Sequence, residues 1–87
     1  MLHLTDTEHQ MLMLIYHLAQ GDWRKVLMRK EVSAGMGMSA AAGEEVLKSL
    51  TKHGLIRYVI IGALSITKQG ISEVALRSMP PNPSRKP

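Results

Sequence analysis

The apolar residues near the start of the chain recur at helical spacing. Four of them repeat at intervals of three or four positions: Met11, Leu14, Ile15 and Leu18. This stripe predicts an amphipathic helix that ends at Gly21. A Thr-x-x-Glu capping box at residues 5–8 marks its start. Three further apolar residues lie outside the stripe: Leu12, Met13 and Tyr16. A helix with one solvated face does not need them, so we expect part of this surface to contact another subunit.

The pattern over residues 22–30 fits two structures. Trp23, Leu27 and Val32 could lie on one face of a helix, and we favour a helix that begins somewhere in this span. The alternative is a short strand at residues 24–27 that precedes the next helix.

Residues 31–39 have the layout of a helix-turn-helix. We expect the first helix to end near Met36, where a glycine opens the turn. Ser39 can cap a second helix with its hydroxyl, and Gly54 can adopt the left-handed conformation that ends it after His53. Two helices that cross at such a turn leave the second one at the surface, where it can enter a DNA groove.

The helix expected at residues 39–53 has two distinct faces. Its inner face carries Val46, Leu47 and Leu50, and Gly43 among them would allow a close neighbour. The opposite face carries a mostly charged stripe: Ala41, Glu44, Glu45, Lys48 and Lys52. Glu44 and Lys48 are four residues apart in the favourable order, so we expect them to form an ion pair.

Residues 55–61 and 64–66 are apolar runs rich in β-branched side chains, and Gly62-Ala63 separates them. This pattern predicts a tight two-stranded hairpin. Both of its faces are apolar, and an uncovered strand of this kind invites pairing with another chain. We therefore expect another element or a second subunit to cover it.

A last helix is expected from the Thr67 cap through Met79. Its predicted inner face consists of Ile71, Val74 and Ala75. Gly70 weakens a helix by about 1 kcal/mol relative to alanine, so we expect a close contact there. Pro80-Pro81 would end the helix. These elements predict an α+β fold, mainly α, with three helices, a short two-stranded hairpin and a C-terminal helix.

The composition limits the chain to one small domain. Its 87 residues are 45% apolar, with seven methionines and no phenylalanine or cysteine, so we expect an aliphatic core and no disulfide. We assign residues 1–79 to the domain and residues 80–87 to a disordered, Pro-rich basic tail. The formal charge is +4. Without Arg85 and Lys86 of the tail, nine basic residues face seven acidic ones, so the domain is only weakly basic.

No apolar stretch is long enough to cross a membrane, and the first residues do not read as a signal peptide. We therefore expect a cytoplasmic protein with no membrane partner. The sequence has no nucleophile with a supporting base and no Gly-rich phosphate loop, so we do not expect an enzyme or a cofactor. Of the histidines, His9 and His17 lie too far apart on one helix for the i,i+4 zinc clamp, so we expect no metal.

The chain resembles the winged helix-turn-helix superfamily of small transcriptional regulators, broadly MarR-like or PadR-like. The matching parts are residues 31–49, residues 54–56 and residues 66–70, within a similarity that covers roughly residues 5–79. The resemblance implies a homodimer formed through the terminal helices, with the second helix of the motif in the DNA major groove. It also implies a basic wing that rests on the DNA backbone or in the minor groove.

Two features depart from that family pattern. The start of the helix at residues 39–53 carries alanines and glutamates where DNA-reading regulators present hydrogen-bonding or basic side chains. The expected wing tip, Gly62-Ala63, carries no charge, and Arg57 lies only at its base.

Our leading hypothesis is a homodimeric transcriptional regulator that binds double-stranded DNA. The expected DNA-binding residues are Ser39, Ala40 and Ala41 near the bases, with Lys48, Lys52, Arg24, Lys25, Arg29, Lys30 and Arg57 as phosphate contacts. A solvated helix face is the other explanation of the basic residues at 24–30. The rival hypothesis is a protein-interaction module that uses the hairpin at residues 58–66 and the first helix, without specific DNA binding.

Overall fold

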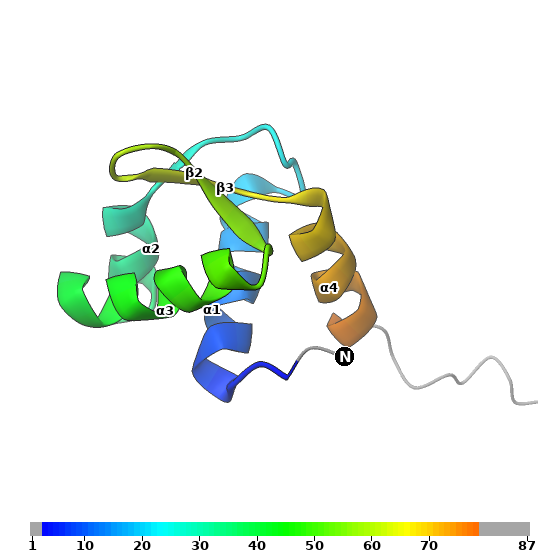
Figure 1. Ribbon diagram of the computed structural model, residues 1–87, viewed down its shortest axis with the longest axis horizontal. Coiled ribbons are helices and arrows are strands. Elements are labelled where there is room, and N and C mark those ends of the chain that lie inside the picture. The colour runs from blue at the N-terminus through cyan, green and yellow to red at the C-terminus, as the bar shows by residue number, and fades with distance from the viewer. Residues whose placement is uncertain (1–2, 79–87) are drawn as a thin grey trace, which may run out of the picture.

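The computed structural model describes residues 3–78. Its elements are α1 (Asp6–Ala19), β1 (Leu27–Met28), α2 (Arg29–Gly35), α3 (Ala40–Lys52), β2 (Ile56–Ile60), β3 (Ala63–Ile66) and α4 (Lys68–Ser78). Over this range the fold is α+β and mainly helical, with four helices and one three-stranded antiparallel sheet. In Figure 1 the β2–β3 hairpin lies above α2 and α3, and α4 lies at the end opposite the hairpin turn. Met79 and the expected tail at residues 80–87 are outside the described residues.

The start of α1 confirms the predicted capping box. The Thr5 hydroxyl accepts from the Glu8 amide at 3.1 Å, and a Glu8 carboxylate oxygen accepts from the Thr5 amide at 2.8 Å. The other carboxylate oxygen accepts from the Ser49 hydroxyl of α3. This bond is the largest of the causes that lower the pKa of the Glu8 carboxyl. The cap therefore also ties α1 to α3.

The inner face of α1 is wider than the predicted stripe. Four of its residues are fully buried: Met11, Leu12, Ile15 and Ala19. Leu14 and Leu18, which we expected to point inward, are only partly buried. The reason is that α1 packs against α2, α3, α4, β1 and β3, so apolar side chains on several sides of it find partners within the same chain. The extra apolar surface at Leu12 is thus explained without a second subunit.

Residues 22–30, whose pattern fits either a helix or a strand, contain the strand β1 and the first residues of α2. β1 pairs with β3, with Leu27 opposite Leu64 and Met28 opposite Ala63, and α2 follows at once from Arg29. The helix that we favoured therefore does begin in this span, at Arg29, but Trp23 and Leu27 precede it and do not share a helical face. The expected hairpin is present as β2 and β3, but β1 adds a third strand that was not predicted, on the open edge of β3 in the order β1-β3-β2.

The helix-turn-helix follows the prediction closely. α2 ends at Gly35 with Met36 as its C-cap, and Gly37 takes a positive φ of 69° in the turn. The Ser39 hydroxyl accepts from the Ala42 amide at 3.1 Å and caps α3. Gly54 has a φ of 76° directly after the end of α3, which confirms the predicted stop.

At Gly43, α3 lies directly against Ser33 of α2. A Cβ added there would lie 2.0 Å from the Ser33 Oγ and 2.9 Å from the Ser33 Cβ, so one of the two residues would have to shift. This confirms the close neighbour that the sequence predicted. Leu47 and Leu50 are fully buried on the same face, while Val46 is partly buried.

The hairpin turn lies one residue earlier than expected. Gly62 has a φ of 82°, so the turn is Ile61-Gly62 and Ala63 is the first residue of β3. All four residues of the central strand β3 are buried, whereas in β2 only Ile56 is buried. The register of β2 against β3 shifts between Tyr58 and Ile60, which is an irregularity of the kind that a β-bulge produces.

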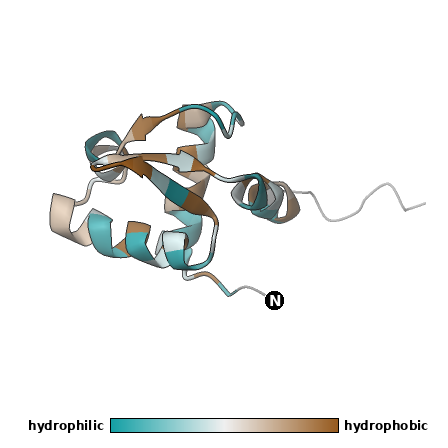
Figure 2. Ribbon diagram, turned by 45° about the horizontal axis from the view of Figure 1, so that its top comes forward, coloured by the Kyte–Doolittle hydropathy of each residue, from teal (hydrophilic) through white to brown (hydrophobic). Residues whose placement is uncertain are grey.

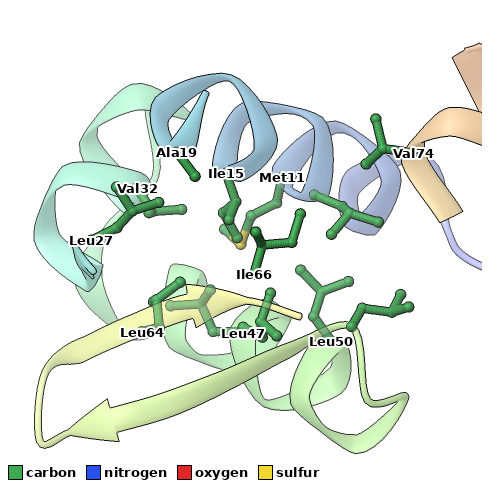
Figure 3. Close-up of a cluster of buried hydrophobic side chains, with 13 residues drawn as sticks. Met11, Ile15, Ala19, Leu27, Val32, Leu47, Leu50, Leu64, Ile66 and Val74 are labelled. Carbon is green, nitrogen blue, oxygen red and sulfur yellow. The ribbon is translucent and has the colours of Figure 1, made fainter. Parts of the chain in front are cut away.

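Every helix and every strand of the described residues contributes to the hydrophobic core. Figure 3 shows Met11 and Ile15 of α1 facing Ile66 of β3, with Leu47 and Leu50 of α3 below them. All five side chains are fully buried. α1 contributes four fully buried apolar residues, more than any other element.

The last helix begins at the predicted cap. The Thr67 hydroxyl accepts from the Gly70 amide at 2.9 Å and donates to the Gly54 carbonyl at 2.7 Å. A Cβ at Gly70 would lie 2.1 Å from the Leu55 carbonyl oxygen, so the predicted close contact is confirmed. Ala75 is exposed, contrary to the prediction, because only a narrow stripe of α4 around Val74 meets the core.

Gly70→Ala should destabilise the protein by about 1–3 kcal/mol, because the new methyl group would overlap a backbone oxygen that cannot rotate away. Helix propensity alone gives the opposite sign, since alanine is about 1 kcal/mol better than glycine inside a helix. Urea denaturation followed by circular dichroism measures the difference. Ser72→Ala, at an exposed position of the same helix, is the matched control and should change the stability by less than about 0.5 kcal/mol. A Gly70→Ala protein as stable as the wild type would contradict the close contact.

Candidate nucleic-acid interface

The first turn of α3 is open to solvent and carries only small side chains. Ser39, Ala40 and Ala41 are exposed, and so is Ala42. They are brought together because Ser39 caps the helix and Gly43 anchors the next turn against α2. Small side chains let a helix approach a DNA groove closely, and a serine hydroxyl or an alanine methyl can contact base edges.

Two lysines continue this exposed face toward the end of α3. Lys48 and Lys52 are both exposed, and they follow Ala41 and Glu45 at helical spacing. The Lys48 Nζ lies 3.9 Å from the Glu45 carboxylate, and both side chains are mostly exposed. The predicted pairing of Lys48 with Glu44 is therefore wrong. An exposed pair of this kind contributes little to stability and leaves the lysine available to other anions.

Glu44 is instead paired with Arg29 at the start of α2. The Arg29 Nη1 donates to the Glu44 Oε1 at 2.9 Å, and both side chains are a little over one third exposed. Glu44 and Glu45 are the two carboxylates of α3 that would repel a phosphate. The ion pair neutralises the charge of Glu44. It also occupies Arg29, so a phosphate that binds this guanidinium must compete with Glu44.

Tyr58 of β2 interacts electrostatically with both members of this ion pair. Burial raises the pKa of the Tyr58 phenol, the Glu44 carboxylate raises it further, and the Arg29 guanidinium opposes them. Charges on α2 and α3 thus act on a side chain of β2. The sequence did not reveal this group of interacting side chains, because Arg29, Glu44 and Tyr58 belong to three successive elements, α2, α3 and β2.

The remaining predicted basic residues divide into two groups. Arg24 and Lys25 lie in the segment before β1, where the Arg24 Nε donates to Asp22 at 3.3 Å. The amide of Arg24 also donates to this carboxylate, and this bond is the main cause that lowers the pKa of Asp22. Lys30 lies on the exposed side of α2, and Arg57 is exposed on β2. Since β1 separates residues 24–25 from residues 29–30, the basic segment is not the single helical face that the sequence suggested.

Two cations of the described residues were not among the predicted ones. Arg77 pairs with Glu73 on α4 at 2.6 Å. The Lys68 ammonium, at the start of α4, lies 4.9 Å from the centre of the Trp23 ring. This is a cation–π contact between groups that are 45 positions apart, so no local signal in the sequence indicates it. The contact holds the segment before β1 against the start of α4. Neither residue belongs to α3.

The described part of the chain offers no set of metal ligands. Residues 3–78 contain no group of three or more His, Cys, Asp or Glu side chains close enough to hold an ion. Among these residues no helix is long and apolar enough to cross a membrane. The exposed face of α3 offers one hydroxyl, methyl groups, the Glu45 carboxylate and two ammonium groups.

Glu44→Gln should lower the pKa of the Tyr58 phenol, because it removes a nearby negative charge, although burial will keep this pKa above the usual value. Arg29→Gln should raise the same pKa, because it removes the opposing positive charge. Titration of the tyrosine ring signals by NMR above pH 8 measures both shifts. Glu45→Gln is the matched control, since the Glu45 carboxylate faces Lys48. Equal responses to the changes at Glu44 and Glu45 would contradict the interaction of Tyr58 with the ion pair.

Comparisons with protein-family models, with curated protein sequences and with solved structures found no match to this chain. The relation to winged helix-turn-helix regulators therefore stays a resemblance carried by residues 31–49 and the elements around them.

Proposed function

We propose that this protein is a winged helix-turn-helix DNA-binding protein, a homodimeric cytoplasmic regulator of transcription whose α3 enters the major groove. The order helix, strand, two helices, hairpin, helix supports this reading. The strand order β1-β3-β2 supports it as well, because it leaves the hairpin beside α3, where a wing would reach the DNA backbone. The role is one of binding rather than catalysis.

The observation that carries the proposal is the exposed face of α3. Residues 39–42 offer no side chain larger than alanine or serine, and Lys48 and Lys52 follow on the same side of the helix. The small residues would approach the bases while the two ammonium groups contact phosphates. Because Ser39 is the only hydrogen-bonding side chain in the first turn, base discrimination by this helix would be modest.

The charges around α3 favour weak, salt-sensitive binding. The Glu44 carboxylate is compensated by Arg29, and Lys30 adds an exposed positive charge on α2. The Glu45 carboxylate still opposes a phosphate contact, and the domain as a whole is only weakly basic. Most of the binding free energy would therefore come from the release of counterions at a few phosphates.

The double variant Lys48→Gln/Lys52→Gln should weaken binding to every duplex sequence alike. It should also reduce the steepness of log affinity against log salt by about 1.8, since each phosphate contact contributes about 0.9. Fluorescence anisotropy with a labelled duplex across a salt series gives both quantities. Lys68→Gln is the matched control, because Lys68 lies against Trp23 on another part of the surface. A slope that the double variant leaves unchanged, or that Lys68→Gln changes equally, would contradict the placement of α3.

A second candidate function is that of a protein-interaction module. The observation that favours it is the exposed apolar surface of β2 and its turn, where Ile60 is 66% and Ile61 96% exposed. Figure 2 shows much of this hairpin in brown, whereas α3 carries several teal turns. Exposed apolar surface of this kind marks contact sites for other proteins.

If the protein is an interaction module, Tyr58→Asp should abolish binding of the protein partner, because a carboxylate on β2 disrupts an apolar contact. Any weak affinity for duplex DNA should stay unchanged, because Tyr58 is not on the exposed face of α3. Affinity capture from cell extract with quantitative mass spectrometry compares the partners of the variant and the wild type. Identical partners for both proteins would rule out β2 as the docking surface.

A further inference from the structure

The ion pair between Arg29 and Glu44 joins the first turn of α2 to α3. The Arg29 Nη1 donates to the Glu44 Oε1 at 2.9 Å, across 15 positions of the chain. Three other ion pairs of the described residues link positions that are only two to four apart. The Arg29–Glu44 pair therefore depends on how two helices pack, and it determines where a positive charge of α2 lies relative to α3.

The packing of the two helices keeps the members of this pair close together. Gly43, the neighbour of Glu44, lies against Ser33, and Ser33 is one helical turn after Arg29 on α2. Because the helices already touch one turn away, the two side chains are near each other before they pair. Pairing then costs less conformational entropy than it would between mobile segments. The Arg29 guanidinium is thus bound to Glu44 in the protein without DNA.

Glu44 borders the face of α3 that the proposed function places against DNA. It follows Ala41 by three residues and precedes Lys48 by four, and both of these residues are exposed. The side chains of Arg29 and Glu44 are 40% and 38% exposed, so a phosphate can reach the guanidinium but has to compete with a carboxylate that is already bound. The negative charge of Glu44 also repels the phosphate itself. Both effects oppose a phosphate contact whatever the base sequence is.

We propose that Glu44 is an internal competitor of DNA phosphate, which limits sequence-independent binding by holding the Arg29 guanidinium. The inference rests on the proposed function and deepens it, because it concerns the regulation of the same face of α3. Sequence-independent binding depends almost entirely on phosphate contacts, so the loss of one contact weakens it directly. The opposite role of Glu44 would be to position Arg29 for a phosphate, and the two roles predict opposite effects of removing the carboxylate.

A double-mutant cycle tests this competition. Fluorescence anisotropy with a labelled generic duplex across a salt series compares the wild type with Glu44→Gln, Arg29→Gln and the double variant. Glu44→Gln should bind about five- to tenfold more tightly at about 0.1 M salt, and its plot of log affinity against log salt should be steeper by about 0.9, because Arg29 then contacts one more phosphate. Adding Arg29→Gln to Glu44→Gln should remove this extra slope, whereas Arg29→Gln alone should leave the wild-type slope unchanged.

Glu45→Gln is the matched control, because it removes the same charge from the next residue of α3 and leaves Arg29 paired with Glu44. Adding Arg29→Gln to Glu45→Gln should therefore leave the slope unchanged. Circular dichroism checks that each variant keeps the fold.

Two results would overturn the inference alone, while the wild type still binds the duplex in a salt-dependent way. One is a Glu44→Gln protein that binds no more tightly than the wild type, or more weakly. The other is a gain in affinity and slope that remains when Arg29 is changed as well, since charge repulsion without competition would explain it. A wild type that binds no duplex even at low salt would instead overturn the proposed function together with the inference.

Discussion

The close approach of α3 to α2 at Gly43 is the constraint on which the arrangement of the surface depends. A Cβ at this position would lie 2.0 Å from the Ser33 Oγ and 2.9 Å from the Ser33 Cβ, so a larger residue would force Ser33 or α3 to shift. The contact fixes the rotation of α3, which buries Leu47 and Leu50 and leaves residues 39–42 in solvent. It also brings the start of α2 within reach of Glu44. The close packing of Gly43 against Ser33 is therefore consistent with which face of α3 is buried, which face is exposed, and the position of Glu44 opposite Arg29.

The two surfaces that stand out have different chemistry and support different contacts. The face of α3 is small and polar with two lysines, which suits close approach to DNA without strong selectivity. The end of the hairpin, with Val59, Ile60 and Ile61 exposed, is apolar and includes an edge strand, which suits contact with protein. The buried residues of β3 hold β2 to the core, while four of the five residues of β2 stay exposed.

Most of the fold could be predicted because its boundaries are set by local signals. The caps at Thr5, Ser39 and Thr67 each involve partners three residues away, and Gly54 takes the left-handed conformation directly after α3. What could not be predicted depends on residues far apart in the sequence. β1 has only two residues, too few to show a period, and pairs with residues 63–64. For the candidate site, the exposure of residues 39–41 and of the lysines on α3 followed from the helical pattern. The Arg29–Glu44 pair did not, because it links residues 15 positions apart across two helices.

The most direct test of the DNA-binding account is an amide NMR titration with a generic duplex of about twenty base pairs, at low and at physiological salt. If α3 binds DNA, the shifts should concentrate on residues 39–52 and around Lys30, and they should fade as salt rises, because counterion release drives the binding. Shifts confined to residues 58–61, or none at low salt, would contradict it. Either of these results would leave the apolar hairpin as the functional surface of the protein.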